Sequence, residues 1–225
     1  ALTAAEGFFF VGLPSEEVRV LRPADGGTQA RFAAPDEVSV APLYVNGHML
    51  FISRDGSLSA LAWLKGTMLW SDPDVGAVGA VAMGENVLVS TQSGSLEHRS
   101  VLNELFWKYE AESPATTPPV AHKLQACFVT QEGWVHSVDV TTGKGKFKMQ
   151  LGPIAATPSA KDGILLLPER SGDLHAFHLE KREVKWSYDL EGALWASPIC
   201  WGNYVYAVSW SNVMRCLSLK TGDDV

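Results

Sequence analysis

The chain has 225 residues, 46% of them hydrophobic and 10% aromatic, with a formal net charge of −7 at pH 7. This acidic balance argues against a nucleic-acid backbone as the main partner, because binding phosphates needs a basic surface. No apolar run reaches the roughly 18 residues of a membrane-spanning helix, so the sequence predicts no such helix.

The stretch 41–70 shows a pattern of turns and short apolar runs that returns along the chain. Four runs of a few residues each are separated by tight turns, and the last run ends on Trp70. The turns lie at residues 46–47, 54–56 and 65–66. Short runs joined by glycine turns predict a meander of four antiparallel strands.

Four landmarks recur in one register about every 40 residues. The inner turn position is Gly7, Gly47, Gly84, Lys123, Gly163 and Gly202. The second turn position is Gly56, Gly94, Gly133, Gly172 and Asn212. The closing aromatic is Phe32, Trp70, Trp107, Phe147 and Trp186, and the opening proline is Pro42, Pro119, Pro158 and Pro198. Glycine and asparagine both tolerate the left-handed backbone that tight turns need.

Repeats of about 40 residues with four strands each are typical of β-propeller blades. A solenoid is the alternative, but its units usually carry fewer strands. We therefore predict an all-β fold, a β-propeller of four-stranded antiparallel blades, with residues 1–225 as a single domain. The six repeats are 1–35, 36–74, 75–112, 113–152, 153–192 and 193–225. Because the last repeat lacks its fourth strand, we expect a longer parent chain with a ring of seven or eight blades.

The sequence predicts no catalytic residue, no metal site and no bound cofactor. Nucleophile elbows, phosphate loops, zinc-binding motifs and EF-hand loops are all missing from it. Cys127, Cys200 and Cys216 are expected to be reduced, because the last two lie on strands separated by a third. Acidic side chains such as Asp55, Asp139 and Asp173 are expected to be solvated at turns.

Three histidines, His98, His136 and His175, fall at apparently equivalent third-strand positions. We predict polar packing between blades for them, with a functional histidine ring as the alternative. His178 is three residues beyond His175, so on a strand it points to the other face and cannot share an ion with it.

The tryptophans divide into two groups. Trp70, Trp107 and Trp186 share the closing position of the repeat, so we predict that they fill the space between blades. The other five break the register: Trp63, Trp134, Trp195, Trp201 and Trp210. Of these, Trp195 stands just before the inner strand of the last repeat, and Trp201 and Trp210 flank its second strand. Off-register aromatics clustered on one end of a propeller predict a partner-binding surface, for which the candidates are Trp195, Trp201 and Trp210. The alternative is isolated surface aromatics, which are normal.

The full motif is a small residue with proline, a glycine turn, an apolar strand, a segment of the form DG-x-L-x-AL, a TG turn and a closing tryptophan. It is clearest in residues 42–70, 158–186 and 198–222. This motif resembles the pyrroloquinoline-quinone-like (PQQ-like) repeat of quinoprotein-type β-propellers. The WD40-like repeat is less similar, since no Gly-His opening or Trp-Asp ending recurs.

The resemblance implies a non-catalytic scaffold that binds a protein or peptide through loops at one end of the ring, similar to scaffold lipoproteins of outer-membrane assembly. Candidate loops are residues 72–76, 113–117 and 190–195. One alternative is the accessory propeller of adenylate-forming, aminoadipate-semialdehyde-type acyl-activating enzymes. A second is a quinone-dependent dehydrogenase fragment. The scaffold would imply a periplasmic location and the accessory propeller a cytoplasmic one.

Overall fold

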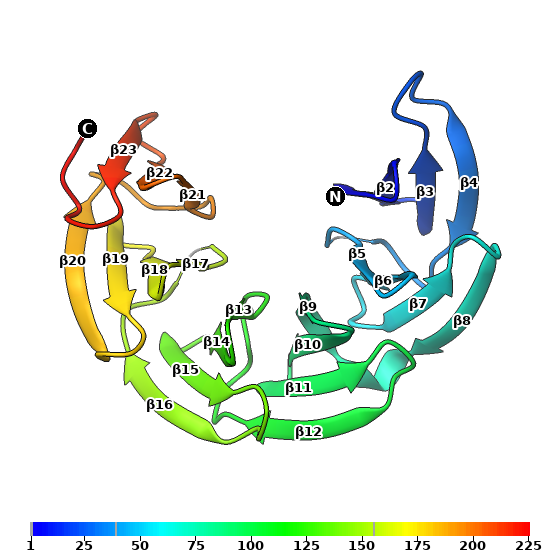
Figure 1. Ribbon diagram of the computed structural model, residues 1–225, viewed down its shortest axis with the longest axis horizontal. Helices are drawn as coiled ribbons and strands as arrows, with labels where there is room; N and C mark the ends of the chain where they lie inside the picture. The colour runs from blue at the N-terminus through cyan, green and yellow to red at the C-terminus, as the bar shows by residue number, and fades with distance from the viewer. Residues whose placement is uncertain (1, 39, 155) are drawn as a thin grey trace. The chain divides into compact units, whose positions relative to one another are not determined.

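The computed structural model describes residues 2–38, 40–154 and 156–225, and their regular structure is almost entirely β-strand. A short 3₁₀ turn, Pro73–Val75, is the one helical element within those ranges. The chain divides into two compact units, Ala1–Ala115 and Thr116–Val225. The described residues form three antiparallel sheets in each unit, and in each sheet neighbouring strands are consecutive in the chain (Figure 1).

The first unit contains three four-stranded sheets. Their strands are β1 (Leu2–Ala5), β2 (Phe8–Leu13), β3 (Glu17–Leu21) and β4 (Thr28–Ala33); β5 (Leu43–Val45), β6 (His48–Ile52), β7 (Leu58–Ala62) and β8 (Thr67–Asp72); and β9 (Ala77–Met83), β10 (Asn86–Thr91), β11 (Ser95–Ser100) and β12 (Leu105–Glu110).

The second unit contains two four-stranded sheets and one with three strands. Their strands are β13 (Val120–His122), β14 (Gln125–Val129), β15 (Trp134–Asp139) and β16 (Gly145–Gln150); β17 (Ser159–Lys161), β18 (Ile164–Pro168), β19 (Asp173–His178) and β20 (Glu183–Asp189); and β21 (Ile199–Trp201), β22 (Tyr204–Val208) and β23 (Met214–Ser218). One sheet falls in each predicted repeat, so the predicted all-β blades are confirmed; Ala1, where the first repeat begins, lies outside the described residues.

The turn landmarks adopt the backbone that the repeat predicts. Gly47 has φ 76° at the second residue of its turn, whereas Lys123, with φ 53°, is the first residue of its turn and corresponds to Asn46, with φ 46°. The predicted alignment of Lys123 with Gly47 is therefore wrong by one residue. At the second turn position, Asn212 has φ 60° in place of glycine. Gly94 is needed there for a second reason, since a Cβ on it would lie 2.4 Å from the carbonyl oxygen of Ser113. The repeat therefore fixes the turn conformation even where the residue type changes.

The outer strand of each four-stranded sheet pairs with the third strand through the same irregular register. Just before the irregularity, the facing pairs are Val20–Ala30, Ala60–Trp70, His98–Trp107, Ser137–Phe147 and Ala176–Trp186. The prediction of Phe32 as the first closing aromatic is wrong, because Phe32 faces Val18 and Ala30 holds that position. Sequence spacing could not show this two-residue offset, because both positions point to the same face of the strand.

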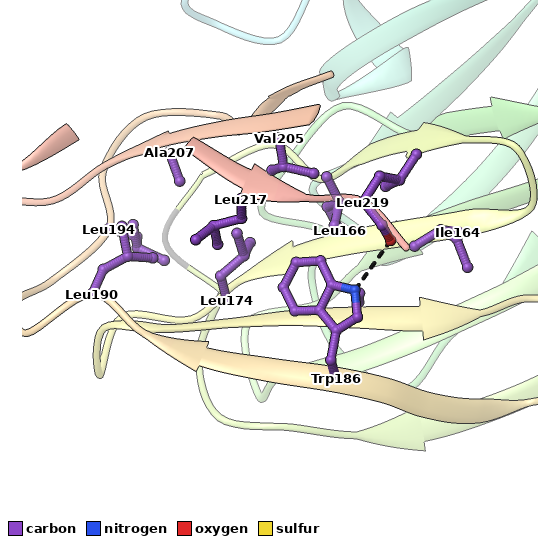
Figure 2. Close-up of a cluster of buried hydrophobic side chains, with 11 residues drawn as sticks. Ile164, Leu166, Leu174, Trp186, Leu190, Leu194, Val205, Ala207, Leu217 and Leu219 are labelled. Carbon is purple, nitrogen blue, oxygen red and sulfur yellow. Dashed lines mark hydrogen bonds between the residues drawn. The ribbon is translucent and has the colours of Figure 1, made fainter. Parts of the chain in front are cut away.

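The predicted packing role of the closing tryptophans is visible at Trp186. Its side chain is 9% exposed and lies among aliphatic residues of sheets β17–β20 and β21–β23 (Figure 2). The indole Nε1–H donates to the carbonyl oxygen of Leu219 at 3.1 Å. Trp70 makes the corresponding bond to Val101 at 3.0 Å. In both places one indole joins the outer strand of a sheet to the residue that follows the third strand of the next.

Trp63 is also part of a core, although it departs from the repeat. It packs edge-on against Phe8 and Phe10, with ring centroids 5.0 and 5.4 Å away. Only 8% of Trp63 is exposed. Its aromatic contacts therefore bury sheet β1–β4 against sheet β5–β8.

Candidate functional site

A backbone clamp brings two off-register tryptophans together at one end of sheet β21–β23. Trp210 lies in the turn after β22, and its backbone N–H donates to the carbonyl oxygen of Ala193 at 3.0 Å. Leu194 forms an isolated bridge with Ser209 next to this bond. Trp195, the residue after Leu194, is therefore fixed beside the turn. The two indole centroids are 5.9 Å apart, with an interplanar angle of 64°.

Both indoles are largely in solvent, because Trp195 is 51% exposed and Trp210 is 72% exposed. They border a shallow hollow of about 310 Å³, whose other lining residues are Ala196, Val208, Ser209 and Asn212. The Arg170 guanidinium lies 5.3 Å from the centre of the Trp195 ring, a cation–π distance. Two rigid aromatic side chains, one beside a guanidinium, form a surface suited to holding an apolar side chain.

Trp201 does not join this pair. It faces Tyr204, the first residue of β22, whereas Trp210 follows the last residue of that strand. The expectation of three tryptophans clustered at one end is therefore corrected to a pair at one end and Trp201 at the other. The reason is strand direction, since residues flanking the two ends of one strand of five residues are separated by roughly its 17 Å length.

The histidines also differ from their predicted equivalence. His136 faces Lys148 and His175 faces Ser187, one residue before the positions opposite the closing aromatic. His98 faces Trp107 itself, so it lies on the other face of its sheet. The contacts described for these histidines lie within their own sheets rather than between blades.

His175 belongs to a polar cluster that the sequence analysis missed. Glu169, Asp173 and His175 each offer a ligand atom, and these atoms lie within 4.8 Å of one another. The hydroxyl of Ser171 is 2.9 Å from Glu169 Oε2 and 3.1 Å from Asp173 Oδ2. A spacing of four and then two residues across a tight hairpin was the available signal, since the turn folds the first residue back onto the others.

The largest cavity described in the second unit lies at the other end of these sheets. It has a volume of about 470 Å³ and is lined mainly by residues of sheets β17–β20 and β21–β23. Its charged lining side chains are of both signs, Asp162 against Lys185 and Lys220. This mixture gives the cavity no evident preference for an anion or a cation.

The cysteines differ in burial. Cys127 is buried in β14, and burial raises the pKa of its thiol to about 12. Cys200 and Cys216 are half-buried, and burial also raises the pKa of Cys200. Thiols with raised pKa values are weak nucleophiles at neutral pH, because the thiolate is the reactive form.

In the described part of the chain, no helix has both the length and the apolar character needed to cross a membrane.

Comparison with known proteins identifies the repeat. A family model of PQQ-type repeats, described as outer membrane protein assembly factor BamB, matches residues 1–144 and 131–225. The crystal structure of BamB from Moraxella catarrhalis is similar, with a TM-score of 0.83 and 17% identity over 100% of this chain and 73% of that one. The computationally designed protein Ika8 gives a TM-score of 0.87 and 14% identity over 100% of this chain and 72% of its own. No curated protein sequence matches. The structural likenesses confirm the β-propeller fold, and at these identities they speak only of fold.

Proposed function

We propose that this chain is a non-catalytic scaffold that binds a protein or peptide partner, because it belongs to the family of PQQ-like propellers described as outer membrane protein assembly factor BamB. The net charge of −7 favours a protein over a nucleic acid as that partner. In this proposal, residues 1–225 form one propeller domain.

The observation that carries the binding proposal is the exposed pair of Trp195 and Trp210. Exposed tryptophans next to a hollow are the residue type that most often dominates binding energy in protein interfaces. The hollow of about 310 Å³ is at the lower end of ligand-pocket sizes, so it has room for one or two side chains. An extended peptide segment with an apolar anchor therefore fits this surface.

The geometry of the pair also explains why a propeller would present it. The clamp between Trp210 and Ala193 fixes the loop before β21 against the loop after β22. Loops held on a rigid sheet lose little conformational entropy when a partner binds, which leaves more of the contact energy for affinity.

A peptide selection on the full chain tests the proposal. Peptides enriched from a random display library would be labelled, and their dissociation constants measured by fluorescence anisotropy. Trp195→Ala and Trp210→Ala should each weaken binding about tenfold or more, as loss of a central aromatic anchor does.

Trp201→Ala is the matched control, because Trp201 is 76% exposed in the same sheet but at its other end. It should change the affinity by less than about twofold, the effect of a peripheral contact. Selection of no binding peptide, or peptides whose affinity is unchanged by both Trp195→Ala and Trp210→Ala, would contradict the proposal. Circular dichroism of each variant separates lost binding from lost folding.

A further inference from the structure

The Glu169, Asp173 and His175 cluster occupies positions that recur in the other sheets. The turn between second and third strands is closed by an N–H···O bond between residues four apart: Ser53 to Ser57, Thr130 to Trp134, Glu169 to Asp173, and Ser209 to Val213. The third position of the cluster, two residues further on, is Ser59, His136, His175 and Arg215 in the same sheets. Among these turns, only Glu169 and Asp173 form a closing pair of two carboxylates.

The imidazole of His175 is held in a fixed direction. Its Nδ1 is 2.7 Å from the hydroxyl of Ser187, and its Nε2 faces Glu169 Oε2 at 3.4 Å. Histidines that bind metals commonly use one ring nitrogen for the ion and the other for such a hydrogen bond. The 3.4 Å separation is long for a charge-assisted hydrogen bond, which is usually about 2.7 to 2.9 Å. It equals the roughly 3.4 Å expected between two ligands at tetrahedral angles on an ion with bonds of about 2.1 Å.

The two carboxylates lack a basic side chain to balance them. Within the described ranges, no lysine or arginine lies within ion-pair distance of Glu169 or Asp173, and His175 is the one titratable base beside them. The buried Glu97 in sheet β9–β12 differs, because Arg99 Nε is 2.7 Å from it and Lys108 Nζ is 3.9 Å from it. A cation beside two carboxylates that lack such a partner would stabilise both in their charged form, because an opposite charge nearby favours ionisation.

Gly152 makes room for one of these carboxylates. A Cβ built on Gly152 would lie 2.1 Å from Oε1 and 2.7 Å from Cδ of Glu169. Since Gly152 has no left-handed φ, alanine would suit its backbone and would displace only the end of the Glu169 side chain. This glycine therefore serves the position of the carboxylate rather than the turn.

We propose that Glu169, Asp173 and His175 bind a divalent metal ion of the zinc class. One imidazole nitrogen with carboxylate oxygens suits zinc, whereas magnesium and calcium prefer oxygen ligands alone. Ligands at tetrahedral angles on bonds of about 2.1 Å are roughly 3.4 Å apart, so a donor pair near the 4.8 Å limit moves together by about 1.4 Å on binding. Water completes the coordination. This site is independent of the proposed peptide surface and stands or falls separately.

Isothermal titration of the chelator-treated full chain with zinc chloride tests the site. We expect one ion per chain and a rise in the melting temperature when zinc is present, because the ion binds the folded state. Glu169→Gln, Asp173→Asn and His175→Gln should each lower the affinity about tenfold or more, since even residues behind the ligands contribute that much. His178→Gln is the matched control and should leave the affinity unchanged, because His178 lies three residues away on the opposite face of β19.

Two further variants test the geometry without removing a ligand. Gly152→Ala should weaken zinc binding by displacing the Glu169 carboxylate, and Ser187→Ala should weaken it about tenfold by releasing the imidazole. Cobalt in place of zinc should give the visible absorption of a protein-bound ion. The proposal is overturned by the absence of saturable zinc binding, or by binding that the three ligand variants leave unchanged, since the ion would then lie elsewhere, for example at Cys200.

Discussion

Sheets β5–β8 and β17–β20 share the framework around their closing strands and differ in the turn between their second and third strands and at the position two residues beyond it. Their closing indoles are Trp70 and Trp186, each bonded to a carbonyl oxygen of the next sheet. The serine hydroxyls Ser71 and Ser187 each bond the side chain opposite them. The differing sets are Ser53, Asp55, Ser57 and Ser59 in the first sheet, and Glu169, Ser171, Asp173 and His175 in the second.

Burial of the turn accompanies this difference in chemistry. Ser53, Ser57 and Ser59 are at most 2% exposed, whereas Glu169, Asp173 and His175 are half-buried. Hydroxyls that find a hydrogen bond can be enclosed at little cost, as Ser57 does with Asp55 and Ser59 with Ser71, but carboxylates need water, a partner or an ion. The repeat thus fixes the backbone of each turn, whereas the burial of the turn decides which side chains it can carry.

The largest expected effect on stability comes from removing a closing indole, which the two sheets share. Trp186→Ala should lower the free energy of unfolding by about 3 to 5 kcal/mol, because a large buried aromatic leaves a cavity. Trp70→Ala should cost less, since Trp70 is only half-buried. Urea denaturation followed by circular dichroism measures both. A loss below about 1 kcal/mol for Trp186→Ala would be inconsistent with its place between sheets.

Exchanging turn residues between the two sheets should be asymmetric. Ser57→Asp should destabilise the chain by about 3 kcal/mol, because it encloses a charge without a partner. Asp173→Ser, measured with a chelator present, should change the stability by less than about 1 kcal/mol, since this position is half-buried. Equal costs for the two substitutions would show that burial does not separate these turns. The same urea titrations decide between the outcomes.

Two glycines at turns of sheet β5–β8 allow the cost in stability of a left-handed backbone to be distinguished from the cost of a close contact. Gly56 has φ 88°, and a Cβ on it would lie 2.9 Å from Gly76 Cα. Gly47 has φ 76° with nothing within 4 Å of such a Cβ. Gly47→Ala should cost about 1 kcal/mol for the left-handed backbone alone, and Gly56→Ala about 2 kcal/mol or more. Similar values in urea denaturation would remove the role assigned to the contact with Gly76.

The smallest expected effect is on the pH dependence of stability, through His98 in sheet β9–β12. His98 takes the position of Ala60 and Ala176, opposite Trp107, and burial lowers the pKa of His98. As the pH falls, the unfolded chain therefore binds a proton at His98 before the folded chain does. Stability should fall as the pH drops through the ordinary histidine value near 6.5. His98→Gln should flatten that part of the profile in urea titrations between about pH 7.5 and 5.5. An unchanged profile would show that His98 titrates as it does when unfolded.

The sequence was sufficient for the repeat, because turns with φ above zero restrict residue choice strongly. Gly47, Gly133 and Asn212 all have the predicted left-handed backbone. The register of the outer strands was harder to predict, as Phe32 shows, because a two-residue slip keeps the same face. The alignment of His98 with His136 failed by one residue, and that single step moves a side chain to the opposite face.

The candidate sites depend on contacts that a repeat pattern does not encode. Trp195 and Trp210 could be singled out because they break the pattern, but only the backbone clamp shows that they meet and that Trp201 does not. Glu169 was overlooked because its partners follow at a hairpin spacing rather than at the repeat spacing.

Because its thiol is buried, Cys127 is a natural probe for local opening of the second unit. A thiol reagent can modify this side chain only after β14 separates from its neighbours, because the folded environment both covers the sulfur and suppresses its thiolate. Cys200 and Cys216 are half-buried and should be labelled earlier. The rate at which the third thiol reacts would therefore report how often sheet β13–β16 opens under native conditions, without any introduced probe.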